Sequence, residues 1–254
     1  MQNIPLTDSV DDMTRRLFAD AGIRSGMTVL DVGCSSGDVS FLLAQIVGQT
    51  GHVTGLDRDE IALDLASKRV QQLNLKNISF IQGDLTRPLP DCSPFNAAVA
   101  RRVIMYLPNP VDAVRRIASL VRPGGIIAFL EHDATMVPGR RIPLPLQEKV
   151  NRWIWQTVER ENADINIGFA LPKILKDAGL TVEHIRAEAI IQTPETRYPT
   201  VPIIRAMLPR IIERGVATEA EIGLDTLEQR LLDEREKAGS LYVSDIVFTI
   251  WARR

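Results

Sequence analysis

The 254-residue chain has little cysteine, few aromatic residues and no long apolar segment. Its two cysteines, Cys34 and Cys92, exclude a disulfide framework and favour a reducing compartment. No apolar run approaches the roughly 20 residues that a membrane-spanning helix needs. The first eight residues lack the charged and apolar regions of a signal peptide. We therefore expect a cytoplasmic protein.

An excess of charge of one sign is also missing. The chain has 30 Lys and Arg residues against 32 Asp and Glu residues, which gives a formal net charge of −2. A global basic field that would hold nucleic acid is therefore not expected. Hydrophobic residues, in contrast, make up 45% of the chain, which is enough for a substantial core. The length suggests one large domain, or one domain with a small lid.

A glycine-containing turn follows the first strongly apolar segment. Residues 28–38 read TVLDVGCSSGD, which predicts a buried strand and then a turn with glycines at 33 and 37. Glycine lets the backbone turn sharply and approach a ligand closely. Apolar residues at helical spacing follow over 39–47. A second apolar run ends at Asp57, where a carboxylate can accept the hydroxyls of a ribose. The unit predicts a nucleoside-containing ligand.

The spacing of the turn separates two classes of such ligands. A dinucleotide fingerprint requires Gly-x-Gly-x-x-Gly, whereas this chain has Asp31-x-Gly33-x-Ser35-x-Gly37. The carboxylate of Asp31 suits a ligand with an ammonium group. The pattern resembles motif I of the class I S-adenosylmethionine-dependent methyltransferases, in which the position of Ser35 is usually glycine. If that position requires a positive φ, serine costs about 1–2 kcal/mol.

The resemblance extends over roughly residues 25–133, in the order and spacing of the family. It implies that Asp57 binds the cofactor ribose, that Asp84 receives the adenine amino group and that Leu85 packs on the adenine ring. It also places the end of the fourth strand beside the methionine part of S-adenosylmethionine, the cofactor, whose product is S-adenosylhomocysteine. The expected cofactor-binding residues are Asp31, Gly33, Ser35, Gly37, Asp57, Arg58, Asp84, Leu85 and Arg101.

Strand and helix patterns alternate along the chain, which predicts a parallel sheet. We expect an α/β fold with a Rossmann-like, doubly wound sheet of about seven strands, the last antiparallel as in the family, and with helical lid insertions. One catalytic domain is expected, and its segments are an N-terminal helix within 1–24, a cofactor-binding core over 25–133, a lid insertion over 134–170, further core over 171–191, a second helical insertion over 192–241 and a last core strand over 242–254.

Three expectations concern the ends of single elements. The N-terminal helix is expected to begin near Asp8, and a helix before the sixth strand is expected over 171–178. Residues 134–146 contain three prolines and predict a loop. A single, strongly charged helix is expected over about 218–238.

Transfer of a methyl group from a sulfonium mainly requires orientation of the reactants and exclusion of water, so a strict catalytic motif is not needed. The best candidate for a general base is His132, because histidine is suited to taking a proton near neutral pH. The alternative is that His132 only lines the pocket. Glu131 and Asp133 are expected to bind a basic substrate group or to orient His132. The residues expected in the substrate pocket are Tyr106, Glu131, Asp133 and Trp153.

Trp153 and Trp155 are two residues apart on a predicted helix, so they do not share one face. We expect one to pack in the core and the other to line the lid. Residues 100–103 read ARRV, where nucleobase methyltransferases have an Asn/Asp-Pro-Pro-Tyr/Phe motif, and this argues against methylation of DNA or RNA adenine. No metal site is expected.

The sequence therefore predicts methyl transfer from S-adenosylmethionine to an N, O or C nucleophile of a small molecule, such as a microbial metabolite or natural product. Quinone-ring C-methyltransferases stay open as a subclass. A nicotinamide-dependent oxidoreductase is disfavoured by the glycine spacing and by the lack of a Tyr-x-x-x-Lys pair. A non-catalytic cofactor-binding member of the fold is the other alternative. The expected partner is a small-molecule methyl acceptor, with no nucleic acid and no membrane; the oligomeric state is undecided.

Overall fold

The computed structural model describes residues 9–87, 89, 94–136, 139–193 and 199–254. The chain forms two compact units. We call one of them the core unit; its segments are Met13–Glu131, Ile167–Ala187 and Phe248–Arg254. We call the other the helical unit; its segments are Met1–Asp12, His132–Asn166 and Glu188–Val247. Asp8 and Cys92 lie outside the described residues.

The core unit is built on a sheet whose strands follow the order β3-β2-β1-β4-β5-β8, with β7 also paired to β8. β1 pairs in parallel with β2 and β4, β2 with β3, and β4 with β5. The last strand is antiparallel, so the expected Rossmann-like fold class is confirmed. The strands are β1 (Thr28–Val32), β2 (His52–Asp57), β3 (Ile78–Gln82), β4 (Phe95–Arg101), β5 (Val121–Asp133), β7 (Thr181–Gln192) and β8 (Tyr242–Arg253), of which the last three continue into the helical unit.

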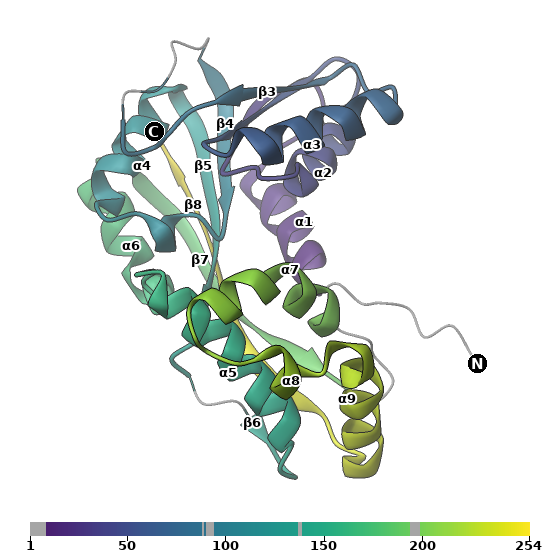
Figure 1. The fold of residues 1–254 in the computed structure, drawn as a ribbon. Coiled ribbons are helices and arrows are strands. Elements are labelled where there is room, and N and C mark those ends of the chain that lie inside the picture. The colour runs from purple at the N-terminus through teal and green to yellow at the C-terminus, as the bar shows by residue number, and fades with distance from the viewer. Residues whose placement is uncertain (1–8, 88, 90–93, 137–138, 194–198) are drawn as a thin grey trace. The chain divides into compact units, whose positions relative to one another are not determined.

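Helices cover both faces of this sheet, with α2 and α3 on one side and α4 and α6 on the other (Figure 1). Strands buried on two faces need continuous apolar runs, and Val29, Leu30 and Val32 of β1 are all fully buried. The helices of the core unit are α1 (Ser9–Ala21, begun in the helical unit), α2 (Asp38–Val47), α3 (Glu60–Gln72), α4 (Pro110–Ser119) and α6 (Ile167–Asp177), with a short 3-10 helix η1 (Ile104–Tyr106) after β4.

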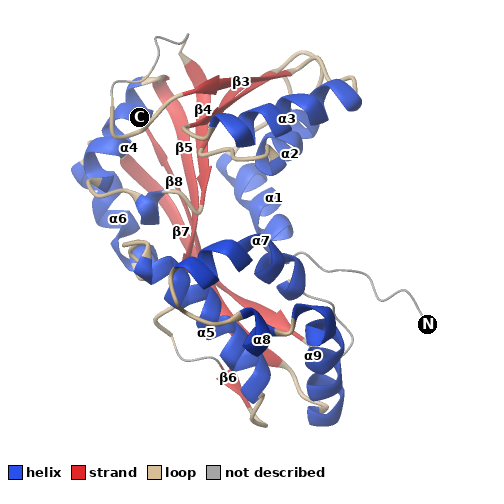
Figure 2. Ribbon diagram, viewed as in Figure 1, coloured by secondary structure: helices blue, strands red, loops and turns tan. Residues whose placement is uncertain are grey.

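The helical unit consists mainly of α5 (Pro145–Arg160), α7 (Thr200–Glu213), α8 (Glu219–Ile222) and α9 (Leu224–Ala238), as Figure 2 shows. A two-residue strand, β6 (Gly139–Arg140), pairs with β8 in antiparallel fashion. Helix α5 contacts α7 and α9, and Leu227 and Leu231 of α9 are buried one turn apart. No helix in the described part of the chain has both the length and the apolar character needed to cross a lipid bilayer.

Three local predictions differ from the structure. The single helix over 218–238 is wrong, because Gly223 adopts a left-handed φ of 54° and separates α8 from α9. Glycine reaches that conformation at no steric cost, and the apolar spacing does not report it. The loop over 134–146 contains β6 and the first residues of α5. The helix expected at 171 begins at Ile167, where Gly168 leaves room for Phe248.

Candidate functional site

A cavity of about 390 Å³ lies in the core unit at the carboxyl ends of β1 to β4. The strand order reverses between β1 and β4, and open α/β sheets bind ligands at such a reversal point. Six residues expected from the sequence line it, namely Gly33, Leu85, Asp57, Arg58, Asp84 and Tyr106. The remaining lining residues are Leu56, Gly83, Thr86, Arg102, Val103, Leu107 and Pro108.

The turn after β1 has the backbone conformation that its glycines suggest. Gly33, Ser35 and Gly37 all have positive φ angles, of 67°, 48° and 91°. Ser35 therefore has the positive φ at which a serine residue is energetically unfavourable. Its N–H donates to Asp57 Oδ2 at 2.8 Å, and the N–H of Asp59 donates to Asp57 Oδ1 at 3.0 Å. Asp57 therefore holds the turn and the entry to α3, a contact that the sequence did not predict.

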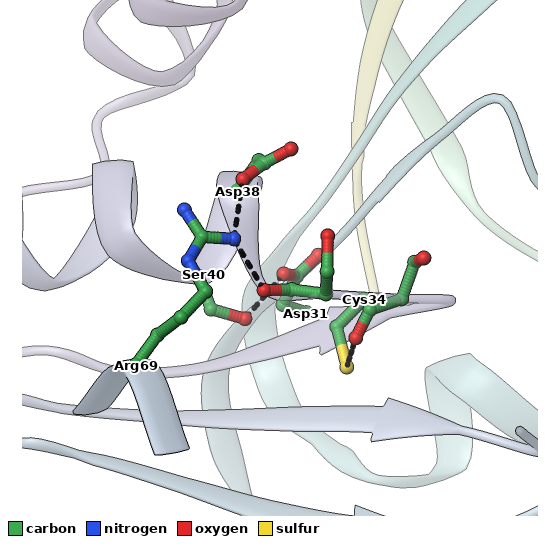
Figure 3. A network of polar contacts seen from close by, with 7 residues as sticks. Asp31, Cys34, Asp38, Ser40 and Arg69 are labelled. Atoms are coloured by element: carbon green, nitrogen blue, oxygen red, sulfur yellow. Dashed lines mark hydrogen bonds and ion pairs between the residues drawn. The ribbon is translucent and has the colours of Figure 1, made fainter. Parts of the chain in front are cut away.

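Asp31 lies beneath this turn and is 1% exposed. The hydroxyl of Ser40 donates to Asp31 Oδ2 at 2.6 Å (Figure 3). Burial raises the pKa of Asp31 to about 7, although the Ser40 hydrogen bond and the charge of Arg101 both lower it. Among the described residues, the lining of the 390 Å³ cavity includes neither Asp31 nor Arg101, and it includes neither Ser35 nor Gly37.

Arg69 of α3 also contacts this turn. Its Nη1 donates to the carbonyl of Ser36 at 2.6 Å and to Asp38 Oδ1 at 2.7 Å (Figure 3). Its guanidinium lies over the ring of Phe41, 4.5 Å from the centroid. The neighbouring Cys34 is buried, and burial raises the pKa of its thiol, which fits a packing role. Sequence reasoning missed Arg69, because no local pattern links it to residues 31 or more positions away.

The loop after β3 presents a second carboxylate. Asp84 Oδ1 accepts hydrogen bonds from the N–H and the hydroxyl of Thr86, both at 2.8 Å. These bonds lower the pKa of Asp84, so its carboxylate stays ionised at neutral pH. The adjacent Leu85 is buried, and Arg116 Nη1 donates to its carbonyl at 2.9 Å. The cavity therefore has an acceptor carboxylate at the end of β2 and another after β3.

The loop after β4 is held by a buried acid. Glu131 Oε1 accepts the N–H groups of Val103 at 2.9 Å and of Ile104 at 2.8 Å. Glu131 is fully buried, and burial raises its pKa to about 7. Arg102, next to the expected Arg101, lines the cavity and has a φ of 58°. Sequence reasoning missed Arg102, and only its unusual backbone angle, which a sequence does not display, marks it.

The candidate base lies in the helical unit. His132 is 3% exposed, and its Nδ1 is 3.8 Å from Asp245 Oδ2. The ring of Trp155 lies 5.9 Å from that of His132, and the Trp155 Nε1–H donates to Asp245 Oδ1 at 3.0 Å. Asp133 Oδ1 accepts the N–H and the hydroxyl of Thr135 at 2.9 and 2.7 Å.

A second cavity, of about 240 Å³, lies within the helical unit. Trp155 lines it, whereas Trp153 is 4% exposed and Lys149 lies over its ring. The other lining residues are Ala134, Met136, Glu148, Asn151, Arg152, Gln156, Glu159, Ile165 and Asp245. Within the described ranges, no group of three or more His, Cys, Asp or Glu side chains is arranged to hold a metal ion.

Fold and cavity together define a Rossmann-like α/β protein with a cavity at the carboxyl edge of its sheet, where such sheets bind ligands. A family profile described as a methyltransferase domain matches residues 23–186, more than half of the chain. The protein belongs to this methyltransferase domain family.

Relatives of known name agree with this family. The demethylmenaquinone methyltransferase of Listeria welshimeri is 31% identical over 118 residues, which are 46% of this chain and 50% of that protein. The demethylmenaquinone methyltransferase of Staphylococcus aureus strain MRSA252 is 30% identical over 125 residues, which are 49% of this chain and 51% of that protein. The chain thus spans about half the length of the curated relatives it matches.

Solved structures agree on the fold. A candidate methyltransferase of Bacillus halodurans superposes with a TM-score of 0.62 at 18% identity, over 94% of this chain and 97% of that chain. At this identity, the likeness shows the fold alone.

Proposed function

We propose that the protein transfers a methyl group from S-adenosylmethionine to a small-molecule nucleophile. The observation that carries the proposal is the 390 Å³ cavity, with Asp57 at the end of β2 and Asp84 in the loop after β3, in a member of the methyltransferase domain family. Its volume falls within the roughly 300–1,000 Å³ typical of small-molecule sites. When bound, the cofactor supplies an electrophilic methyl carbon.

The residues around the cavity fit an adenosine group. Each oxygen of a carboxylate has about two lone-pair sites, so Asp57 can accept ribose hydroxyls while it keeps the N–H groups of Ser35 and Asp59. Asp84 can accept from the adenine amino group, with Leu85 as an apolar neighbour for the ring. Asp31 is buried beneath the glycine turn and does not line this cavity, so its role toward the ammonium group stays a prediction from the family resemblance.

His132 is the proposed general base. The carboxylate of Asp245, with its Oδ2 3.8 Å from His132 Nδ1, is placed to orient the imidazole ring. Segments 134–170 and 192–241 are proposed as the lid that recognises the acceptor. The curated relatives are named for demethylmenaquinone, so we propose that compound as the first acceptor to assay. A small-molecule partner and a cytoplasmic location stay predictions.

Calorimetric titration with S-adenosylhomocysteine tests the cofactor assignment, with NAD as the competing ligand. We expect micromolar binding of the first and none of the second. Asp57→Ala should weaken binding by about 1–3 kcal/mol, or roughly fivefold to 150-fold. Asp64→Ala, an exposed acid on α3 outside the cavity, is the matched control.

Asp57 also supports the turn, so the thermal midpoint of each variant has to be measured beside its affinity. Asp57→Asn keeps an acceptor oxygen and should fall between the wild type and Asp57→Ala. Preferential binding of NAD, or equal affinity of the Asp57→Ala variant for S-adenosylhomocysteine, would contradict the proposed site. Transfer of a labelled methyl group to demethylmenaquinone then tests the acceptor.

A further inference from the structure

The loop after β4 forms one wall of the 390 Å³ cavity. Residues 102, 103 and 106–108 all line it. The loop begins with Arg102 at a φ of 58°, a left-handed conformation that non-glycine residues seldom adopt. Such conformations persist where surrounding contacts impose them, and they cluster at ligand sites. The contacts that impose this conformation therefore bear on the shape of the cavity.

Glu131 on β5 provides such contacts. Its Oε1 accepts the N–H groups of Val103 and Ile104, at 2.9 and 2.8 Å. These N–H groups open the 3-10 helix η1, where no preceding turn of helix offers carbonyl partners. The second oxygen, Oε2, is buried and has no hydrogen-bond partner among the described residues. The carboxyl group thus directs one oxygen to the start of the loop.

A fully buried carboxyl group with one oxygen unpaired is costly for the stability of the fold. Burial raises the pKa of Glu131 to about 7, while the N–H groups of Ile104 and Val103, the charge of Arg102 and the N–H group of Met105 lower it. A neutral amide oxygen could accept the same two N–H groups, through weaker hydrogen bonds but without the cost of burying a charge. Stability therefore does not account for an acid at this position, which points to a role in the site.

The loop in turn contacts the glycine turn after β1. A Cβ atom built on Gly33 would lie 2.4 Å from Val103 Cγ2. The Val103 side chain thus occupies the space that the missing Gly33 side chain leaves. Both residues line the cavity. A chain of direct contacts leads from Glu131 through Val103 to Gly33, and so connects β5 with two walls of the cavity.

We propose that Glu131 is a positioning residue for the cofactor: by holding the N–H groups of Val103 and Ile104, it keeps Val103 against Gly33 and sets the shape of the pocket. This inference rests on the proposed function, in which the cavity holds S-adenosylmethionine. An ionised carboxylate makes hydrogen bonds roughly twice as strong as a neutral acceptor. Pocket order, and with it cofactor affinity, therefore increases as Glu131 ionises.

The test compares the wild type with Glu131→Ala, Glu131→Gln and the control Glu183→Gln, an acid on β7 that pairs with Arg253 at the surface. S-adenosylhomocysteine is titrated into each at pH 6 and pH 8. We expect Glu131→Ala to raise the dissociation constant at least tenfold, and Glu131→Gln to restore most of the affinity. The increase in S-adenosylhomocysteine affinity from pH 6 to pH 8 should be smaller in Glu131→Gln than in the wild type, because the variant lacks the titrating group at position 131. Some increase should remain in both proteins, because Asp31 titrates in both.

Hydrogen exchange reports on the anchor without any ligand. The amides of Val103 and Ile104 should exchange fastest in Glu131→Ala, at an intermediate rate in Glu131→Gln, and at the wild-type rate in the control. If Glu131→Ala does not fold, Val103→Ala tests the next contact, because it keeps the N–H bond and removes the side chain against Gly33. It should weaken cofactor binding while the exchange of the Val103 amide stays slow.

The outcomes separate the two proposals. A wild type that does not bind S-adenosylhomocysteine would overturn the proposed function and the positioning role with it. If the wild type binds S-adenosylhomocysteine, and a folded Glu131→Ala variant has the same affinity and the same amide exchange, only the positioning role is overturned. If Glu131→Ala does not fold, unchanged affinity in Val103→Ala would likewise overturn it. An identical pH dependence in the wild type and Glu131→Gln would also overturn it.

Discussion

Replacing Gly33 by alanine should destabilise the core unit for two separable reasons. The backbone at Gly33 has a φ of 67°, and an L-residue in the left-handed region costs about 1–2 kcal/mol. The new methyl group would also lie 2.4 Å from Val103 Cγ2, and overpacking of this kind typically costs about 1–3 kcal/mol. Together, the free energy of unfolding should fall by about 2–5 kcal/mol.

Urea unfolding, followed by circular dichroism, measures this loss. Gly22→Ala is the matched control, because Gly22 has a φ of 87° with nothing within 4 Å of an added Cβ. The control should lose the conformational part alone, about 1–2 kcal/mol. The difference between the two variants isolates the contact with Val103.

A double variant tests whether that contact is the cause. Val103→Ala removes both Cγ atoms and leaves its own Cβ, 3.4 Å from the added methyl group. The Gly33→Ala, Val103→Ala protein should therefore be more stable than the sum of the single losses predicts, by about 1–3 kcal/mol. Strict additivity would refute the reasoning. So would a loss in Gly33→Ala no larger than the loss in Gly22→Ala.

Two further predictions concern titrating groups. Burial raises the pKa of Asp31 from 3.8 to about 7, so between these pH values the folded state keeps a proton that the unfolded state has lost. The contribution of Asp31 to the free energy of unfolding therefore falls as the pH rises from about 4 to 7 and is constant above pH 7. Over this range, the stability of Asp31→Asn should rise by up to about 4 kcal/mol relative to that of the wild type. Urea unfolding that gives the same stability difference between the two proteins at pH 5 and at pH 8 would contradict this. His132→Ala should lower the rate of labelled methyl transfer with little change in S-adenosylhomocysteine affinity, and an unchanged rate would leave His132 without a role as base.

The sequence alone was enough to predict the alternating strands and helices of the core unit and the position of Asp57 at the end of a strand, whereas Asp84 followed from the family resemblance. These features depend on residues that are close together in the chain, because apolar spacing, turn glycines and the residue that ends a strand are local patterns. The same locality explains an error. Apolar spacing is judged over several helical turns, so it did not reveal the break at Gly223. This single residue has a left-handed conformation and separates α8 from α9.

Only the tertiary structure showed which side chains support the candidate site. Glu131 accepts the N–H group of a residue 28 positions away, and Arg69 donates to a carbonyl 33 positions away. In the helical unit, Trp155 likewise donates to an acid 90 positions away. Partners so distant are brought together by the packing of whole elements, and one chain has no local pattern that encodes such a pair. The sequence thus determined the family, the fold class and the positions of Asp57 and Asp84, while the packing determined which distant side chains hold the turns beside the cavity.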